Sequence, residues 1–254
     1  LSTLSNVSIY SVYFMVIKGV KTLFLSMTNG IQSLLGELWA RQELEELRKT
    51  FGWMEWCIHT GTTFVFSCTA ALIVPFVQVY TAGINDANYI QPAFAILLTL
   101  ANAMHCLRLP YNIMVLAAGH YKQTQKNYIV AATVNIILSA LTVKAWGLIG
   151  VTIGTLAAMA YQTAWLAIYD SNNFIFWPMK SVIKQFMVDG ITAVFIMVIS
   201  GMLSMRSISY LSWIVLAMAT ALVAVIITVF LNLIMYKDKM MALIHILQRG
   251  KANE

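Results

Sequence analysis

Seven long apolar stretches follow one another along the chain, and short polar connectors separate them. The stretches cover approximately residues 5–36, 53–79, 90–117, 128–143, 146–168, 187–204 and 210–235. About 20 consecutive apolar residues are enough to cross a bilayer as a helix. The pattern therefore predicts an all-α fold, a polytopic membrane helix bundle with about seven transmembrane helices.

The composition supports a membrane protein and gives little ground for an enzyme. Hydrophobic residues make up 60% of the chain and charged residues 10%, whereas a soluble domain carries roughly 25% charged residues. The three cysteines lie in apolar stretches, and neither they nor the four histidines have metal-ligand spacing. Because no nucleotide-binding loop and no catalytic carboxylate pair or Ser/His/Asp arrangement is apparent, we expect neither a cofactor nor an enzymatic activity.

The connectors alternate between two kinds. One set is rich in lysine and arginine, and the other set nearly lacks them. Since cytoplasmic loops carry the basic excess, the first set is predicted to be cytoplasmic. The first helix then runs inward, residues 41–50 form a cytoplasmic amphipathic connector, and residues 236–254 form a cytoplasmic tail. The basic residues counted are Arg41, Arg48, Lys49, Lys122, Lys126, Lys180, Lys184, Lys237, Lys239, Arg249 and Lys251 on the first side, and Lys144 and Arg206 on the second.

This distribution of charge also bears on partners and on the acidic residues. The basic excess follows topology and forms no single patch, so we do not expect a nucleic-acid partner. The charges of residues 40–56 are interpreted as solvating a connector. Asp170 and Asp189 lie near cytoplasmic ends of their stretches, and the sequence gives no reason to assign them a special role.

A polar stripe runs along the first apolar stretch and includes a lysine near its middle. On a helical wheel its members fall within an arc of about 80°, and Lys21 lies about 60° beyond Lys18. Such a face is a poor surface for lipid, so we expect it to line protein or a water-filled cavity. The alternative is that the lysines snorkel to the interface. The stripe consists of Ser8, Ser11, Lys18, Thr22, Ser26, Asn29 and Ser33.

The third stretch carries a second polar face. His105, Arg108 and Asn112 share an arc of about 60°, and Pro110 predicts an interruption of the helix beside them. A guanidinium group pairs bidentately with phosphate or carboxylate, which makes Arg108 a candidate oxyanion receptor. Two alternatives remain open, namely that Arg108 binds free carbonyls or a partner elsewhere, and that His105 only bonds a neighbouring helix.

Small residues in the fifth stretch indicate close helix packing. Gly150 and Gly154 are spaced four residues apart, with Ala157 and Ala158 beyond them, and this spacing lets two helices approach closely. Asn135, Ser139 and Thr142 share a face of the preceding stretch and are interpreted as hydrogen-bonding contacts between helices.

Several stretches together resemble a known family. "VSIYSVYFMVIKGV" (7–20), "RLPYNIMVLAAGHYKQTQKN" (108–127) and "WGLIGVTIGTLAAMAYQ" (146–162) are similar to bacterial polysaccharide transporters of the Wzx type. These belong to the multidrug/oligosaccharidyl-lipid/polysaccharide exporter superfamily. The likeness implies about fourteen helices in two bundles, of which this chain would be the C-terminal half. The chain starts at Leu1 without a recognisable signal peptide, so we expect a fragment that lacks the N-terminal bundle.

The resemblance also implies a function and a location. Similar proteins lie in the bacterial cytoplasmic (inner) membrane and flip undecaprenyl-diphosphate-linked oligosaccharides by alternating access, alongside polysaccharide polymerase machinery. A proton or sodium gradient is a possible source of energy. By wheel position and depth, the candidate cavity residues for the diphosphate are Lys18, Lys21, Arg108, Ser11, Ser26, Asn29, His105 and Asn112.

Three alternatives stay open. A multidrug or lipid II exporter of the same superfamily would share the fold, but a pump for drug cations would favour acidic cavity residues. A membrane-embedded polymerase or glycosyltransferase should show a large outer loop or an acid/base cluster. A scaffold without transport activity would have no need of the polar stripe on the first helix.

Overall fold

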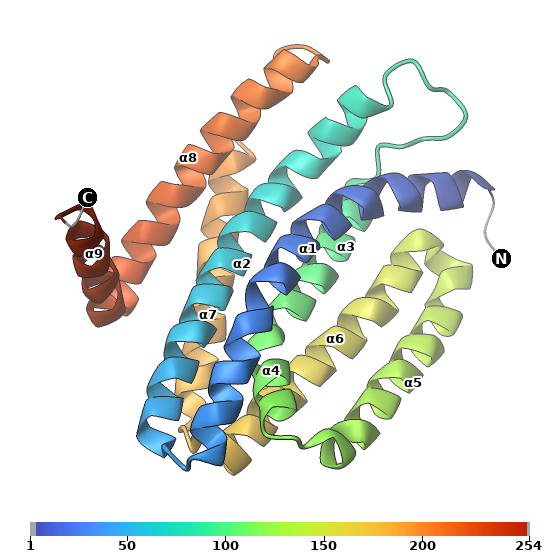
Figure 1. Ribbon diagram of the computed structural model, residues 1–254. Helices are drawn as coiled ribbons and strands as arrows, with labels where there is room; N and C mark the ends of the chain where they lie inside the picture. Colours follow the sequence, from blue (N-terminus) through green and yellow to red (C-terminus); the bar gives the residue numbers. More distant parts are fainter. Residues whose placement is uncertain (1–3, 253–254) are drawn as a thin grey trace.

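The computed structural model describes residues 4–252, and all side chains in that range except those of residues 27, 29 and 247–252. This part of the chain is helical throughout its regular structure and contains no strand (Figure 1). The elements are α1 (Leu4–Ala40), α2 (Leu44–Tyr80), α3 (Pro92–Leu107), α4 (Leu109–Ala117), α5 (Tyr121–Trp146), α6 (Leu148–Asp170), the π-helical turn η1 (Ser171–Ile175), α7 (Met179–Ser200), α8 (Tyr210–Met235) and α9 (Lys237–Ala252).

Seven segments of the described chain are long and apolar enough to cross a membrane. These are α1, α2, α3 together with α4, α5, α6 together with η1, α7 and α8. The prediction of an all-α polytopic bundle is therefore confirmed. Helices α5, α7 and α8 expose large apolar side chains, among them Leu141, Met187 and Leu222, as expected of surfaces that face lipid.

The connectors fall at two opposite ends of the bundle. Arg41–Glu43, residues 118–120 and residues 171–178 lie at the lower end in Figure 1, whereas residues 81–91, Gly147 and residues 201–209 lie at the upper end. The charged stretch 41–50 consists of a tight turn, in which Gln42 has a φ of 59°, and the first turns of α2. The predicted basic connectors thus share one end of the molecule.

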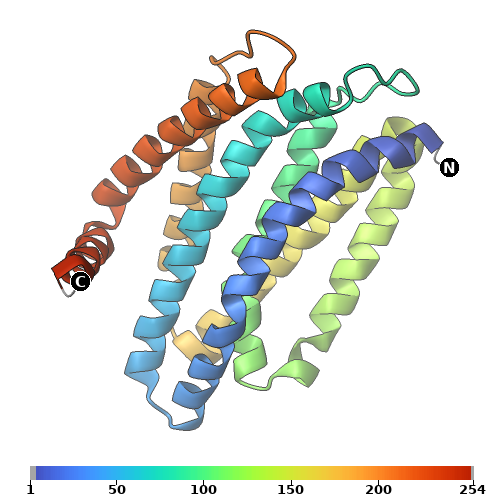
Figure 2. The same cartoon turned by 45° about the horizontal axis from the view of Figure 1, so that its top comes forward.

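Helix α2 is the central element, because α1, α3, α7 and α8 all pack against it (Figures 1 and 2). Two indole groups hold α8 to it. Trp56 Nε1 donates to Asn232 Oδ1 at 2.8 Å, and Trp213 Nε1 donates to the carbonyl of Leu72 at 3.2 Å. A buried indole N–H needs such a partner, so these two bonds fix the position of α8 along α2.

The 81–91 connector is tied to α1 through one buried tyrosine. The Tyr13 hydroxyl donates to the carbonyl of Tyr89 at 2.8 Å and accepts from the backbone N–H of Gln91 at 3.2 Å. The Tyr13 ring also packs edge-on against Phe94 of α3. This arrangement places the apolar side of α1, including Ile17 and Phe24, inside the bundle.

Helices α5 and α6 form a tight hairpin. Gly147 makes the turn with a φ of 54°, a conformation that residues with a side chain rarely adopt. The Thr142 hydroxyl donates to the carbonyl of Gly150 at 2.8 Å. A Cβ atom on Gly150 would lie 2.5 Å from the Thr142 backbone, and one on Gly154 would lie 2.8 Å from the backbone N of Ser139. The predicted packing role of these glycines is therefore confirmed.

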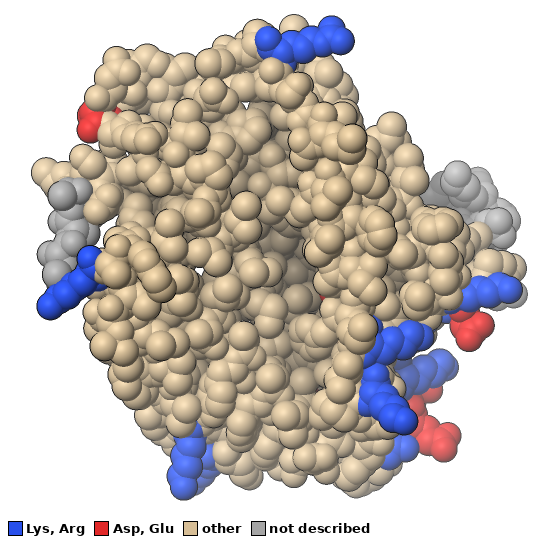
Figure 3. Space-filling view, turned by 180° about the vertical axis from the view of Figure 1, so that it is seen from behind, with Lys and Arg blue, Asp and Glu red and all other residues tan. Residues whose placement is uncertain are grey.

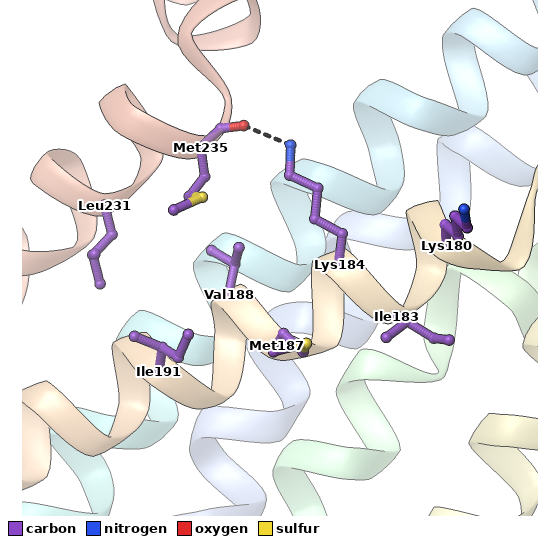
Figure 4. A pocket seen from close by; sticks show the side chains of 8 residues that line it. All are labelled: Lys180, Ile183, Lys184, Met187, Val188, Ile191, Leu231 and Met235. Atoms are coloured by element: carbon purple, nitrogen blue, oxygen red, sulfur yellow. Dashed lines mark hydrogen bonds between the residues drawn. The ribbon is translucent and has the colours of Figure 1, made fainter.

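A groove of about 360 Å³ separates α7 from α8 near their lower ends, as Figure 4 shows. Its wall is apolar except for Lys180 and Lys184. Lys184 Nζ donates to the carbonyl of Met235 at 2.8 Å. A cation thus satisfies a free carbonyl at the C-terminal end of α8 and offsets the partial negative charge of that helix end.

We predict that Gly154→Ala destabilises the protein. The added methyl group collides with the backbone of α5, and overpacking of this kind costs about 1–3 kcal/mol. The measurement is the thermal unfolding midpoint of the purified protein in nanodiscs, which should fall. Gly30→Ala is the matched control, because a Cβ there meets no atom within 4 Å. Equal midpoints for the two variants would contradict the close approach of α5 and α6.

Candidate anion-binding site

Three basic side chains from separate helical elements gather near the middle of the bundle. Lys21 lies halfway along α1, His105 is in the last turn of α3, and Arg108 occupies the junction between α3 and α4. Arg108 Nη2 donates to His105 Nδ1 at 3.1 Å. Lys21 is close enough to both to interact with them electrostatically. The structure therefore brings together three of the residues that the sequence suggested.

The local sequence explains why Arg108 sits at a junction. Pro110 lies at the second position of α4 and has no backbone N–H to donate, so the helix is interrupted one residue after Leu107. The Arg108 N–H still bonds the Met104 carbonyl at 3.1 Å, and its own carbonyl accepts from the Asn112 N–H at 3.0 Å. The predicted interruption beside Pro110 is thus confirmed, and it holds the Arg108 backbone in a defined place.

Arg108 is buried without a compensating anion. Its exposed fraction is 8%, and Nε has no hydrogen-bond partner. No carboxylate in the described part of the chain forms an ion pair with Arg108 or with Lys21. An uncompensated charge at this depth is costly. A ligand that carries phosphate or carboxylate oxygens would accept the free guanidinium donors and balance the charge.

Two polar side chains complete the surroundings of Arg108. The Tyr128 hydroxyl donates to Asn112 Oδ1 and joins α4 to the first half of α5. Tyr128 also interacts electrostatically with Arg108. Asn112 thus lies beside the basic cluster as the wheel predicted, and its carbonyl oxygen is taken up by a contact between helices.

The polar stripe of α1 does not face the interior of this bundle. Ser11, Lys18 and Ser26 are exposed, on the side of α1 opposite to the buried Tyr13. The Ser26 hydroxyl bonds back to the carbonyl of Thr22 on its own helix. Whether this face lines a cavity stays a prediction, because the described chain does not cover it. The Asn29 side chain lies outside the described part.

Sequence reasoning missed a second, acidic cluster. Asp189 lies midway along α7, with an exposed fraction of 6%, and Asp170 and Glu55 are 1% and 4% exposed. The expectation that Asp189 lies near a helix end is wrong, because α7 begins at Met179. The interpretation of Glu55 as part of a solvated connector is also wrong, because Glu55 is buried within α2, whereas Asp170 is the last residue of α6, near a helix end as expected, but buried. Helix α7 also buries Gln185.

A helical wheel of α2 would have revealed the residues that this helix contributes to the cluster. Glu55, His59, Thr62 and Thr63 recur at helical spacing and therefore share one face.

Comparisons with protein-family models, with curated proteins and with solved structures find no match to this chain. The resemblance to polysaccharide transporters therefore stays a prediction, and the chemistry of the two clusters is the main guide to function.

We predict that inorganic diphosphate stabilises the protein through Arg108. A ligand that binds only the folded state raises stability by about 1.4 kcal/mol at roughly ten times its dissociation constant. The unfolding midpoint in nanodiscs should therefore rise with diphosphate for the unaltered protein and stay constant for Arg108→Gln. Arg206→Gln, in the exposed upper connector, is the matched control and should respond as the unaltered protein does. If diphosphate still raised the unfolding midpoint of Arg108→Gln, the anion would bind elsewhere.

Proposed function

We propose that the protein is part of a flippase that carries undecaprenyl-diphosphate-linked oligosaccharides across the bacterial cytoplasmic membrane by alternating access. One observation carries the proposal, namely the buried, uncompensated Arg108 with Lys21 and His105 beside it. A diphosphate crossing an apolar bundle needs cationic donors at that depth, and Arg108 and Lys21 supply them.

The depth of the cluster fits a substrate that crosses the whole bilayer. Lys21 is 17 residues from the start of α1 and 19 from its end, or about 26 Å and 28 Å along the axis. Arg108 follows 16 residues of α3, which span about 24 Å. Nine residues of α4 follow Arg108, about 14 Å along the axis, so neither side chain is close to an end of its membrane span, where snorkelling alone would explain a cation.

The open polar face of α1 supports a second part of the proposal. Ser11, Lys18 and Ser26 remain exposed here, and hydroxyl and ammonium groups are unfavourable against lipid. A second bundle packed opposite α1 would enclose this face and form a central cavity around the sugar. The stretches that resemble polysaccharide transporters agree with such a two-bundle protein.

A multidrug exporter of the same superfamily is the second candidate. The observation that favours it is a largely apolar cavity of about 240 Å³ between α2, α3 and α7 with Asp189 in its wall. However, Asp189 Oδ2 is bound to His59 and Oδ1 to Gln185, so the carboxylate is less available to a drug cation. The basic cluster favours the flippase.

The test is flipping of a fluorescent undecaprenyl-diphosphate oligosaccharide by the full-length protein in liposomes, followed with a quencher that cannot cross the membrane. We expect Arg108→Gln and Lys21→Gln each to slow flipping at least tenfold, because each removes a charge that meets the diphosphate, and a factor of ten corresponds to about 1.4 kcal/mol. Lys18→Gln should slow it as well if the α1 face lines the pathway.

Lys122→Gln is the matched control, since Lys122 is exposed on the first turn of α5 and the variant should flip substrate at the unaltered rate. Unchanged flipping in Arg108→Gln and Lys21→Gln, with normal folding, would reject the role of this cluster. Uptake of drug cations without flipping would favour the exporter.

A further inference from the structure

A buried polar contact joins α2 to α7. His59 is fully buried, and its Nδ1 lies 2.6 Å from Asp189 Oδ2. Gln185 Nε2 donates to the other carboxylate oxygen at 3.2 Å. The ring of Phe186 packs edge-on against the imidazole at 5.0 Å. At this distance one proton must lie between Nδ1 and Oδ2, because two unprotonated acceptors would repel each other.

One side of the pair opens to a cavity. The space of about 240 Å³ between α2, α3 and α7 is lined by Asp189 and by the hydroxyl-bearing residues Thr62, Thr63 and Thr99. Thr62 is fully buried, and its Oγ1 has no hydrogen-bond partner. Figure 3 shows the molecule from behind, where a hollow lies in the middle of a mostly uncharged face and the lysine and arginine side chains lie near the outline of the molecule. Water in this cavity could reach the carboxylate and bond the free hydroxyl.

We propose that His59 and Asp189 form a protonation site that exchanges one proton with this cavity. In the loaded state the pair carries two protons, one between Nδ1 and Oδ2 and one more, and has no net charge. On release one proton passes from the pair to water in the cavity and the other stays between Nδ1 and Oδ2, which leaves a neutral imidazole and an ionised carboxylate with a net charge of −1. The change of one charge inside an apolar bundle is large enough to favour a different packing of α7 against α2.

The groups that face this site make the loaded state favourable. Glu55, one turn before His59 on α2, accepts a 2.7 Å hydrogen bond from the Tyr111 hydroxyl of α4. Asp170 of α6 is almost fully buried, and neither of its carboxylate oxygens has a partner. On the other side, Lys239 of α9 donates to the carbonyl of Gly52 at 2.8 Å. Burial lowers the pKa of Lys239, while Glu55 acts in the opposite direction.

Three carboxyl groups thus share the region with one imidazole and one ammonium group. Full ionisation of Glu55, Asp170 and Asp189 would leave the region negative even with His59 protonated and Lys239 charged. A bound proton reduces this excess, since like charges at close range disfavour ionisation.

A proton fits the site better than a sodium ion does. Sodium needs several oxygen ligands, but both Asp189 oxygens are already engaged by donors from His59 and Gln185. No group of three or more His, Cys, Asp or Glu residues in the described chain is arranged to hold a metal ion. Under the proposed function, this pair is the point at which a proton gradient acts on transport. That statement rests on the proposed function, whereas the protonation site itself does not.

The site is tested by proton-uptake titration of the full-length protein in nanodiscs. We expect Asp189→Asn and His59→Gln each to bind one proton fewer per chain across the pH range in which the protein stays folded. Asn85→Ala is the control, because Asn85 is exposed in the upper connector and has no titratable side chain, so its proton count should equal that of the unaltered protein. An unchanged proton count in both site variants would overturn the proposal, as would a titration midpoint that moves with sodium concentration.

A second measurement covers the case in which the variants fail to fold. In the unaltered protein labelled with ¹³C-aspartate, difference infrared spectra between high and low pH should show a buried aspartate that gains or loses its proton, together with a change in the imidazole bands. If neither the aspartate band nor the imidazole bands changed, the proposed protonation site would be contradicted.

Coupling is tested separately by imposing a pH gradient in the flipping assay. The unaltered protein should respond to the gradient, and Asp189→Asn should flip at a rate that the gradient does not alter. Flipping by the unaltered protein that ignores the gradient would reject coupling while leaving the titration result intact. Absence of flipping under every condition would instead reject the proposed function.

Discussion

Moving an ionised side chain from water into a membrane-spanning bundle costs several kcal/mol unless another group compensates its charge. This protein contains two buried clusters in which the compensation is incomplete, and they have opposite signs. Around Arg108 the described chain supplies cations and no acid. Around Asp189 it supplies more carboxyl groups than bases. The described residues therefore leave each cluster with an unbalanced charge, which an anion would offset in the first case and a proton in the second.

The two clusters meet at the short helix α4. Tyr111 and Asn112 are neighbours in sequence and project in different directions, since successive residues of a helix are turned by about 100°. Tyr111 bonds Glu55 on the acidic side, and Asn112 bonds Tyr128 beside Arg108. The interruption at Arg108 separates α4 from α3. A small rotation of α4 would therefore disturb both clusters at once, which gives a physical route by which charge in one could influence the other.

Much of the fold could be predicted from hydropathy alone, because each helix that crosses a membrane needs a continuous run of apolar residues. The helix interruption at Pro110 and the close packing at Gly150 and Gly154 were equally accessible, since each depends on the local chemistry of one residue type. The bounds of α7, in contrast, could not be predicted from the sequence. Its first eight residues include Lys180 and Lys184, which lower the local hydropathy. As a result, the sequence placed Asp189 at an end of its helix instead of in the middle.

For the site, the sequence indicated which basic residues share a helix face, but not that α1 and α3 bring Lys21, His105 and Arg108 together. That proximity depends on tertiary packing.

The hairpin of α5 and α6 has a consequence for how the protein is made. Helix α5 is largely exposed and packs mainly on α6, through glycine contacts and hydroxyl bonds that join residues only 8 to 12 positions apart. Contacts this local form quickly, before distant parts of the chain have arrived. We therefore expect the two helices to leave the insertion machinery as a preassembled pair during synthesis. The other helices of the bundle would then pack against a preformed pair of helices instead of against a single isolated helix.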